Sequence, residues 1–143
     1  MPVKPENAAR YPRDWPAISR TAKERAGWRC VHTDEHGNRC AAYQYAVGFW
    51  RMGVFLPSAQ AGKTFTESRQ HAAELYQALG EEGDKPVVIV LTTAHLDHRP
   101  ENCESANLAP MCQRHHLAYD HHHHRINAQA TRRAKAGTLE LFE

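Results

Sequence analysis

The spacing of apolar residues predicts two amphipathic helices in the first two thirds of the chain. Between residues 15 and 26, apolar side chains recur at intervals of three or four with charged residues between them, and Gly27 follows as a typical helix end. Residues 66–79 repeat this period. There Thr66 and Arg69 form an imperfect version of the capping box that often starts a helix.

Three further segments predict the loop and β structure that these helices pack against. Residues 86–93 (PVVIVLTT) form a continuous β-branched and apolar run of strand length. Residues 45–55 (YAVGFWRMGVF) are aromatic and interrupted by glycine, which suits either a hairpin or an irregular apolar layer. Residues 30–40 (CVHTDEHGNRC) are polar and are predicted to be a loop.

The last third of the chain changes from a turn-rich piece into a helix. We expect this helix to begin near Met111 and to continue, with or without a break, to Ala136, where Gly137 stops it. The order from residue 86 onward is therefore strand, loop and helix. Together with the earlier segments, it predicts an α+β fold.

Length and composition limit the class of protein further. A chain of 143 residues is the size of one domain. It has no run of about 18 apolar residues and no apolar core of a secretory signal at its N-terminus, which predicts a cytoplasmic protein without a membrane partner. The oligomeric state stays open between monomer and homodimer. In a reducing compartment, the four cysteines favour metal binding or burial over disulfides.

Charge is distributed unevenly, although the formal net charge is only +2. Residues 1–29 carry seven Lys or Arg against three acids, and residues 113–135 carry five against one. Residues 66–84 reverse the balance, with five acids against one Arg. A polyanion is therefore expected to meet the two basic segments, although solvated helix faces would give the same counts.

Two pairs of side chains predict a structural zinc site. Zinc in structural sites takes four Cys or His ligands, usually as two short-range pairs. Cys112 and His115 have two residues between them, a spacing that lets both reach one ion. The partner pair is Cys30 and Cys40, which nine residues separate where two to four are usual.

Other ligand sets are compatible with the same spacing. His32 or His36 lies inside the loop and could replace one of its two cysteines. Cys103 could also serve, although a small buried side chain is the simpler interpretation. A pair of buried thiols without metal would give the same sequence pattern.

Residues 95–116 hold the densest group of chemically active side chains, namely His95, Asp97, His98, Asn107 and His116. Hydrolysis of a phosphodiester needs a base that deprotonates water and a cation that neutralises charge developing on the phosphate and the leaving oxygen. It also needs a group that orients the base. Imidazole, carboxylate and amide side chains can supply these roles.

The run AHLDHRPENCESANLAPMCQRHHLAYD resembles the ββα-metal, or His-Asn-His, finger of phage and bacterial endonucleases. In that finger an Asp-His dipeptide ends a strand, an Asn lies in the following loop, and a His or Asn lies on the helix. The nine positions from Asn107 to His116 fit this pattern, and the H-x-D-H opening is similar to resolvases of the recombination endonuclease VII type. The resemblance extends weakly, through residues 10–30, 45–50 and 137–142, to about three-quarters of the chain.

This chain departs from the family pattern at two points, both in the zinc site. The first knuckle is stretched, and His115 stands where a cysteine is expected. The resemblance implies one small domain over residues 1–143, with a zinc-braced ββα-metal finger flanked by helices. Its parts would be a basic N-terminal helix region (1–29), zinc knuckles and core (30–116), and a basic C-terminal helix and tail (117–143).

Carried over position by position, the resemblance gives each residue of the group a role. It implies that His98 is the general base and that Asp97 and His116 bind a catalytic divalent ion, with magnesium as the default and manganese, nickel or zinc also suited to a His ligand. Asn107 would fix the loop and orient His98. Adjacent residues on a flat strand point to opposite faces, so Asp97 and His98 converge only where the strand has turned. An alternative register pairs His95 with Asp97.

The function implied is metal-dependent cleavage of DNA. Phosphate contacts are expected from arginines of the last helix, namely Arg114, Arg125, Arg132 and Arg133. The alternative is a zinc-dependent nucleic-acid-binding module without catalysis, and a third hypothesis is a metallohydrolase acting on another substrate. The sequence leaves open the strandedness, branching and sequence of the preferred substrate.

Overall fold

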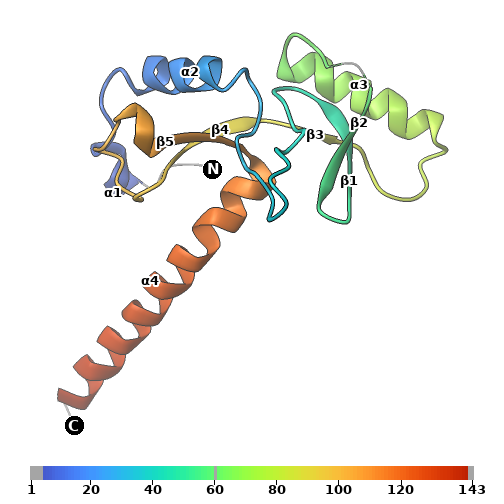
Figure 1. Cartoon of the computed structure of the whole chain (residues 1–143). Helices are drawn as coiled ribbons and strands as arrows, with labels where there is room; N and C mark the ends of the chain where they lie inside the picture. Colours follow the sequence, from blue (N-terminus) through green and yellow to red (C-terminus); the bar gives the residue numbers. More distant parts are fainter. Residues whose placement is uncertain (1–4, 60, 142–143) are drawn as a thin grey trace. The chain divides into compact units, whose positions relative to one another are not determined.

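The computed structural model describes residues 5–59 and 61–141, so residues 1–4 and 142–143 of the predicted terminal regions lie outside the described part. The chain divides into two compact units, Met1–Gln113 and Arg114–Glu143. The α+β class is confirmed (Figure 1). In chain order the elements are α1 (Pro5–Ala8), α2 (Trp15–Arg25), β1 (Val47–Arg51), β2 (Val54–Ala59), α3 (Phe65–Ala78), β3 (Val87–Val88), β4 (Leu91–His95), η1 (Ser105–Asn107), β5 (Leu108–Cys112) and α4 (Gln113–Leu141).

A three-stranded antiparallel sheet, in the order β2-β1-β3, contains the predicted hairpin. Met52 and Gly53, both at positive φ, form the two-residue turn between β1 and β2, as the right-handed twist of hairpin strands favours. Gly48 allows the two strands to approach, because a Cβ atom there would lie 2.2 Å from the Leu56 carbonyl oxygen. Of the two interpretations of residues 45–55, the hairpin is the one that forms.

A second antiparallel sheet consists of β4 and β5, whose pairing runs from Leu91 opposite Cys112 to His95 opposite Leu108. Helix α2 packs against both strands. The buried Ser19 and Thr93 hydroxyls are 2.8 Å apart and hydrogen-bond between helix and sheet. Residues 108–112 form strand β5, where the sequence pattern predicted a turn-rich piece that passes into a helix near Met111.

The prediction of one continuous strand over residues 86–93 is wrong. The run is divided into β3 and β4, which belong to different sheets. Between them the buried Ile89 exchanges backbone hydrogen bonds of 2.8 Å with Ala46 and Tyr45. The amides of Val90 and Leu91 then donate to glutamine side chains at 3.1 and 2.7 Å. Side-chain acceptors from distant segments thus replace the ladder at this junction.

Helix α3 is confirmed, but its predicted cap is wrong. The N-cap is Thr64, whose hydroxyl accepts a hydrogen bond of 3.2 Å from the Glu67 amide. The Glu67 carboxylate in turn accepts a bond of 2.7 Å from the amide of Lys63. Thr66 and Arg69 lie inside the first turns of the helix. The acidic residue that a capping box requires is therefore present, two positions earlier than predicted.

Helices α2 and α4 differ in how well their ends were predicted. Helix α2 ends where expected, at Arg25, with Ala26 as its C-cap and Gly27 following at a φ of +69°. Helix α4 begins two residues later than Met111, because Met111 belongs to β5. It also continues through Gly137 to Leu141. A glycine inside a helix costs only about 1 kcal/mol relative to alanine, so it does not by itself end one.

The main core of the first unit lies between the two sheets and the 30–42 loop. Its fully buried side chains include Phe55, Ile89 and Leu91, and two of the cysteines, Cys30 and Cys112, are also completely buried. None of the helices in the described ranges is long and apolar enough to cross a membrane.

Candidate functional site

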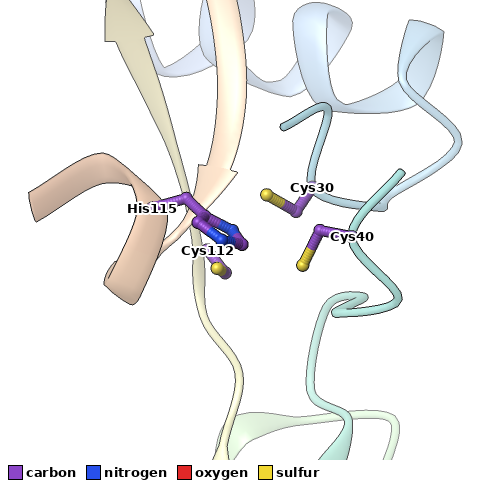
Figure 2. Close-up of side chains that lie close together, drawn as sticks. All are labelled: Cys30, Cys40, Cys112 and His115. Carbon is purple, nitrogen blue, oxygen red and sulfur yellow. The ribbon is translucent and has the colours of Figure 1, made fainter. Parts of the chain in front are cut away.

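Four side chains from distant parts of the sequence gather at one point, as the sequence analysis predicted. The ligand atoms of Cys30, Cys40, Cys112 and His115 all lie within 4.8 Å of one another. Figure 2 shows the three sulfur atoms and the imidazole ring pointing toward a common centre. Cys30 and Cys112 are buried, and the other two are half-buried. This cluster of three cysteines and one histidine could hold a structural zinc ion.

The donor set of the cluster fits a tetrahedral zinc site. Sulfur atoms bound at the usual zinc–sulfur distance lie roughly 3.8 Å apart, which is within the observed spread of ligand atoms. None of the four cysteines, all of which the structure describes, is in a disulfide. Hydrogen bonding from Cys112, and then from Cys40, lowers the pKa of the Cys30 thiol. A thiolate is the form that binds metal.

Local backbone contacts explain how the cluster assembles. The loop segment that contains Cys30 is attached to β5, because the Val31 amide donates a hydrogen bond to the Pro110 carbonyl at 3.0 Å. The Cys40 amide donates to the His32 carbonyl at 2.8 Å, which folds the loop back on itself. Cys112 ends β5, and His115 follows three residues later in the first turn of α4.

The alternative ligands named above do not join the cluster. Among the described residues, these four side chains are the one group of three or more potential ligands whose donor atoms lie within 4.8 Å of one another. Neither His32 nor His36 belongs to this group. Cys103 lies elsewhere, with its sulfur 3.8 Å from His95 Nε2, and its thiol donates to the Pro100 carbonyl at 3.4 Å. Burial raises the pKa of the Cys103 thiol.

A network of amide and carboxylate groups closes the loop between β4 and β5. The Asp97 amide donates to Asn107 Oδ1 at 3.0 Å, and Asn107 Nδ2 donates to Asp97 Oδ1 at 3.0 Å. Asn102 Nδ2 donates to Asp97 Oδ2 at 2.9 Å, and the Arg99 amide donates to Asp97 Oδ1 at 2.8 Å. The Asn102 side chain, followed by the Arg99 amide and Asn107, lowers the pKa of Asp97 to about 2. The carboxylate is therefore ionised at neutral pH.

His98 lies in this loop beyond the end of β4. Its backbone is in the left-handed region, with a φ of +57°, and its amide donates to the His95 carbonyl at 3.0 Å. The side chain is half-buried, whereas that of Asp97 is exposed. The strand ends at His95, so the restriction that adjacent strand residues point apart no longer applies to Asp97 and His98.

His95 occupies a different environment at the end of β4. It is only 8 % exposed, and its ring stacks on Trp15 with the ring centroids 4.7 Å apart. Tyr11 lies edge-on to the same imidazole at 5.7 Å. The N-terminal segment is held there by Arg10, whose Nη2 donates to Glu101 Oε2 at 3.2 Å. These contacts join residues far apart in sequence, and no spacing pattern indicated them.

Helix α4 contains the remaining predicted residues, His116 and the four arginines. Nε2 of His116 lies 3.1 Å from the Asp120 carboxylate, and the two side chains are 18 % and 15 % exposed. Sequence reasoning missed Asp120, although its position four residues after a histidine is the signal for such a helical pair. The four predicted phosphate-contacting arginines are all exposed.

Comparisons with protein-family models, curated proteins and solved structures gave no match.

Proposed function

We propose that the protein is a metal-dependent DNA endonuclease of the His-Asn-His type, with its nuclease site in residues 95–116. The order of the elements carries this proposal. Antiparallel strands β4 and β5 are joined by the closed loop that contains Asp97, His98 and Asn107, and α4 begins directly after β5. Two strands and a helix in this order are what the resemblance of the sequence implies.

The cluster of three cysteines and one histidine supports the same proposal. As a structural zinc site it would join the loop after α2 to the end of β5 and the first turn of α4. Its binding free energy would then contribute to the folding free energy. A small chain gains most from such a cross-link, because its apolar core is limited.

His98 is the side chain that we assign as general base. A neutral imidazole is suited to accept a proton from water near pH 7. Its half-buried position in the loop leaves it accessible, whereas His95 is packed under two aromatic rings. Asn107 closes the loop on which His98 lies, and so acts as a positioning residue.

Asp97 and His116 are the proposed ligands of the catalytic ion. The Asp97 carboxylate is ionised and offers the oxygen ligand that hard divalent cations prefer. Hydrogen bonds from the described residues occupy three of its roughly four acceptor positions, two on Oδ1 and one on Oδ2, which leaves a position on Oδ2 for the ion. A bound divalent ion, magnesium by default, would polarise the scissile phosphate and stabilise the leaving 3′ oxygen. Attack of water with departure of the 3′ oxygen would leave the phosphate on the 5′ end.

Three arginines of α4 form the proposed DNA-contacting stripe. Arg114, Arg125 and Arg132 are separated by 11 and 7 residues, close to three and two helical turns, so they share one face over roughly 27 Å. Arg133 lies about 100° around the helix from this stripe. His116 lies roughly 160° from it, so the stripe is expected to contribute affinity rather than chemistry.

Cleavage of supercoiled plasmid tests the proposal. We expect nicking or linearisation with magnesium or manganese, none with EDTA, and none for His98→Ala with its fold and zinc content intact. His36→Ala is the matched control, because His36 is exposed at the tip of the 30–40 loop. Salt-sensitive binding without metal-dependent cutting of plasmid, linear or branched DNA would overturn the nuclease and favour the non-catalytic zinc module.

A further inference from the structure

Two Arg-Cys dipeptides, Arg29-Cys30 and Arg39-Cys40, make a reciprocal contact beside the candidate metal centre. Arg29 Nε donates to the Cys40 carbonyl at 2.7 Å, and Arg29 Nη2 donates to the Arg39 carbonyl at 3.0 Å. Arg39 Nε donates to the Cys30 carbonyl at 3.0 Å, and Arg39 Nη2 donates to the Arg29 carbonyl at 3.0 Å. Each guanidinium therefore binds both carbonyls of the opposite dipeptide. We call these four residues the Arg-Cys clasp.

The clasp acts on the peptide groups that orient the two cysteines. The carbonyls of Arg29 and Cys30 belong to the peptide planes on either side of the Cys30 Cα atom, and those of Arg39 and Cys40 flank the Cys40 Cα in the same way. Because a peptide group is planar, fixing both neighbouring planes fixes the direction of the Cα–Cβ bond. The guanidinium groups thereby fix the direction in which both cysteine side chains leave the backbone.

The clasp holds together two ligands, Cys30 and Cys40, that lie far apart in the sequence for a zinc-binding pair. Nine residues separate Cys30 and Cys40, and the loop between them folds back through a turn in which the Gly37 amide donates to the Asp34 carbonyl at 3.0 Å. A short knuckle holds its two ligands together at one tight turn, whereas here the turn lies at residues 34–37 and each cysteine lies three or four residues away from it. Arg39 also donates to the carbonyl of Ala26 at 2.6 Å, which connects the clasp to the end of α2.

We propose that Arg29 and Arg39 are positioning residues of the metal centre, which preorganise Cys30 and Cys40 for binding and so set the affinity for the ion. The inference rests on the proposed zinc site and not on DNA cleavage. Partners outside the ligand shell typically change metal affinity by about 10–100-fold. Two guanidinium charges also favour the net negative charge of a centre with three thiolates and one divalent cation.

Cobalt binding by the full-length, metal-stripped chain tests the proposal, because cobalt bound to thiolates gives charge-transfer bands that report the ligand set. We expect Arg29→Gln and Arg39→Gln each to lower the cobalt affinity by about 10–100-fold, with the three-thiolate spectrum retained. Arg20→Gln, which changes an exposed arginine of α2, should bind like the parent protein. Parent-like affinity in both clasp variants would overturn the clasp and leave the metal centre standing.

Lysine variants and thermal unfolding complete the test. Arg29→Lys and Arg39→Lys keep the charge but lose the paired donors of the guanidinium, so we expect at least about tenfold weaker binding even if the Gln variants fold poorly. The rise in unfolding temperature on metal addition should shrink in the clasp variants, whereas a packing role alone would lower the loaded and metal-free values equally. Parent-like affinity in the lysine variants, or an unchanged rise, contradicts the proposal. A parent protein without a three-thiolate spectrum would overturn the centre and the clasp together.

Discussion

Asp97 and Asn107 are joined by two hydrogen bonds of 3.0 Å that run in opposite directions. The Asp97 amide donates to Asn107 Oδ1, and Asn107 Nδ2 donates to Asp97 Oδ1. Asn107 Nδ2 also donates to the Asn102 carbonyl at 2.8 Å. One amide side chain therefore closes the whole loop between β4 and β5, including the backbone on which His98 lies.

Replacing Asn107 should reduce cleavage without releasing zinc. In Asn107→Ala the loop loses its closing bonds, and misplacement of a catalytic group by about 1 Å can cost roughly 100-fold in rate. Asn107→Asp keeps one acceptor but sets two carboxylates against each other, so we expect no rescue. Single-turnover plasmid cleavage measures the effect, with Asn7→Ala in α1 as the control. Parent-like rates for Asn107→Ala would contradict the positioning role.

Removal of the structural ion should lower the unfolding temperature. An ion present at a hundred times its dissociation constant stabilises the native state by about 2.7 kcal/mol, which corresponds to roughly 10 °C for a chain of this size. Cys40→Ser should bind less than one zinc per chain by elemental analysis, whereas Cys103→Ser, outside the cluster, should keep it. A metal-free protein that melts at the same temperature as the loaded one would exclude a structural role.

The helices and the cysteine cluster could be predicted because their signals are local. The apolar period gives α2 and α3, and the two-residue gap between Cys112 and His115 indicates one half of a metal site. The other half, Cys30 and Cys40, was identified by residue type despite its long gap. The repeated Arg-Cys dipeptide that explains this gap is visible in the sequence, but its meaning depends on four hydrogen bonds formed only after folding.

The errors arise where distant side chains decide the local structure. The apolar run 86–93 is divided because the side chains of Gln44 and Gln113 accept from the backbone at its centre. The pattern of residues 108–112 predicts a turn-rich piece that passes into a helix, yet these residues form β5, in which Pro110 lies opposite Thr93. The spacing of apolar residues in either segment carries no information about contacts with residues far away in the sequence. The pattern alone therefore could not predict the two sheets.

The arginine stripe of α4 should control binding more than turnover. Replacing Arg114, Arg125 and Arg132 together by Gln removes three positive charges from one helix face, so the slope of log K against log salt should become shallower by about 2.7 for duplex DNA. The cleavage rate at saturating DNA should stay close to that of the parent. Fluorescence anisotropy at several salt concentrations measures the slope. An unchanged slope would place the DNA on another surface.

Gly137→Ala should stabilise α4. Gly137 lies inside the helix, and a Cβ atom there meets nothing within 4 Å beyond its chain neighbours and the nearby backbone of its own helix. Alanine at a helical position is favoured over glycine by about 0.5–1 kcal/mol. Amide hydrogen exchange around residue 137 should therefore slow by roughly two- to fivefold if opening of the helix limits exchange. Gly53→Ala, at a φ of +79° in the β1–β2 turn, should instead destabilise its region.

His95 and His98 can be separated by substitutions matched to their environments. His95→Phe keeps a ring against Trp15 but removes the imidazole nitrogens, so the fold should be retained. If His98 is the base, this variant should cleave plasmid within about tenfold of the parent, a change in barrier of about 1.4 kcal/mol. His95→Ala should instead lose about 2 kcal/mol or more of unfolding free energy, because it empties a buried position. A well-folded but inactive His95→Phe, beside an active His98→Ala, would transfer the role of general base to His95.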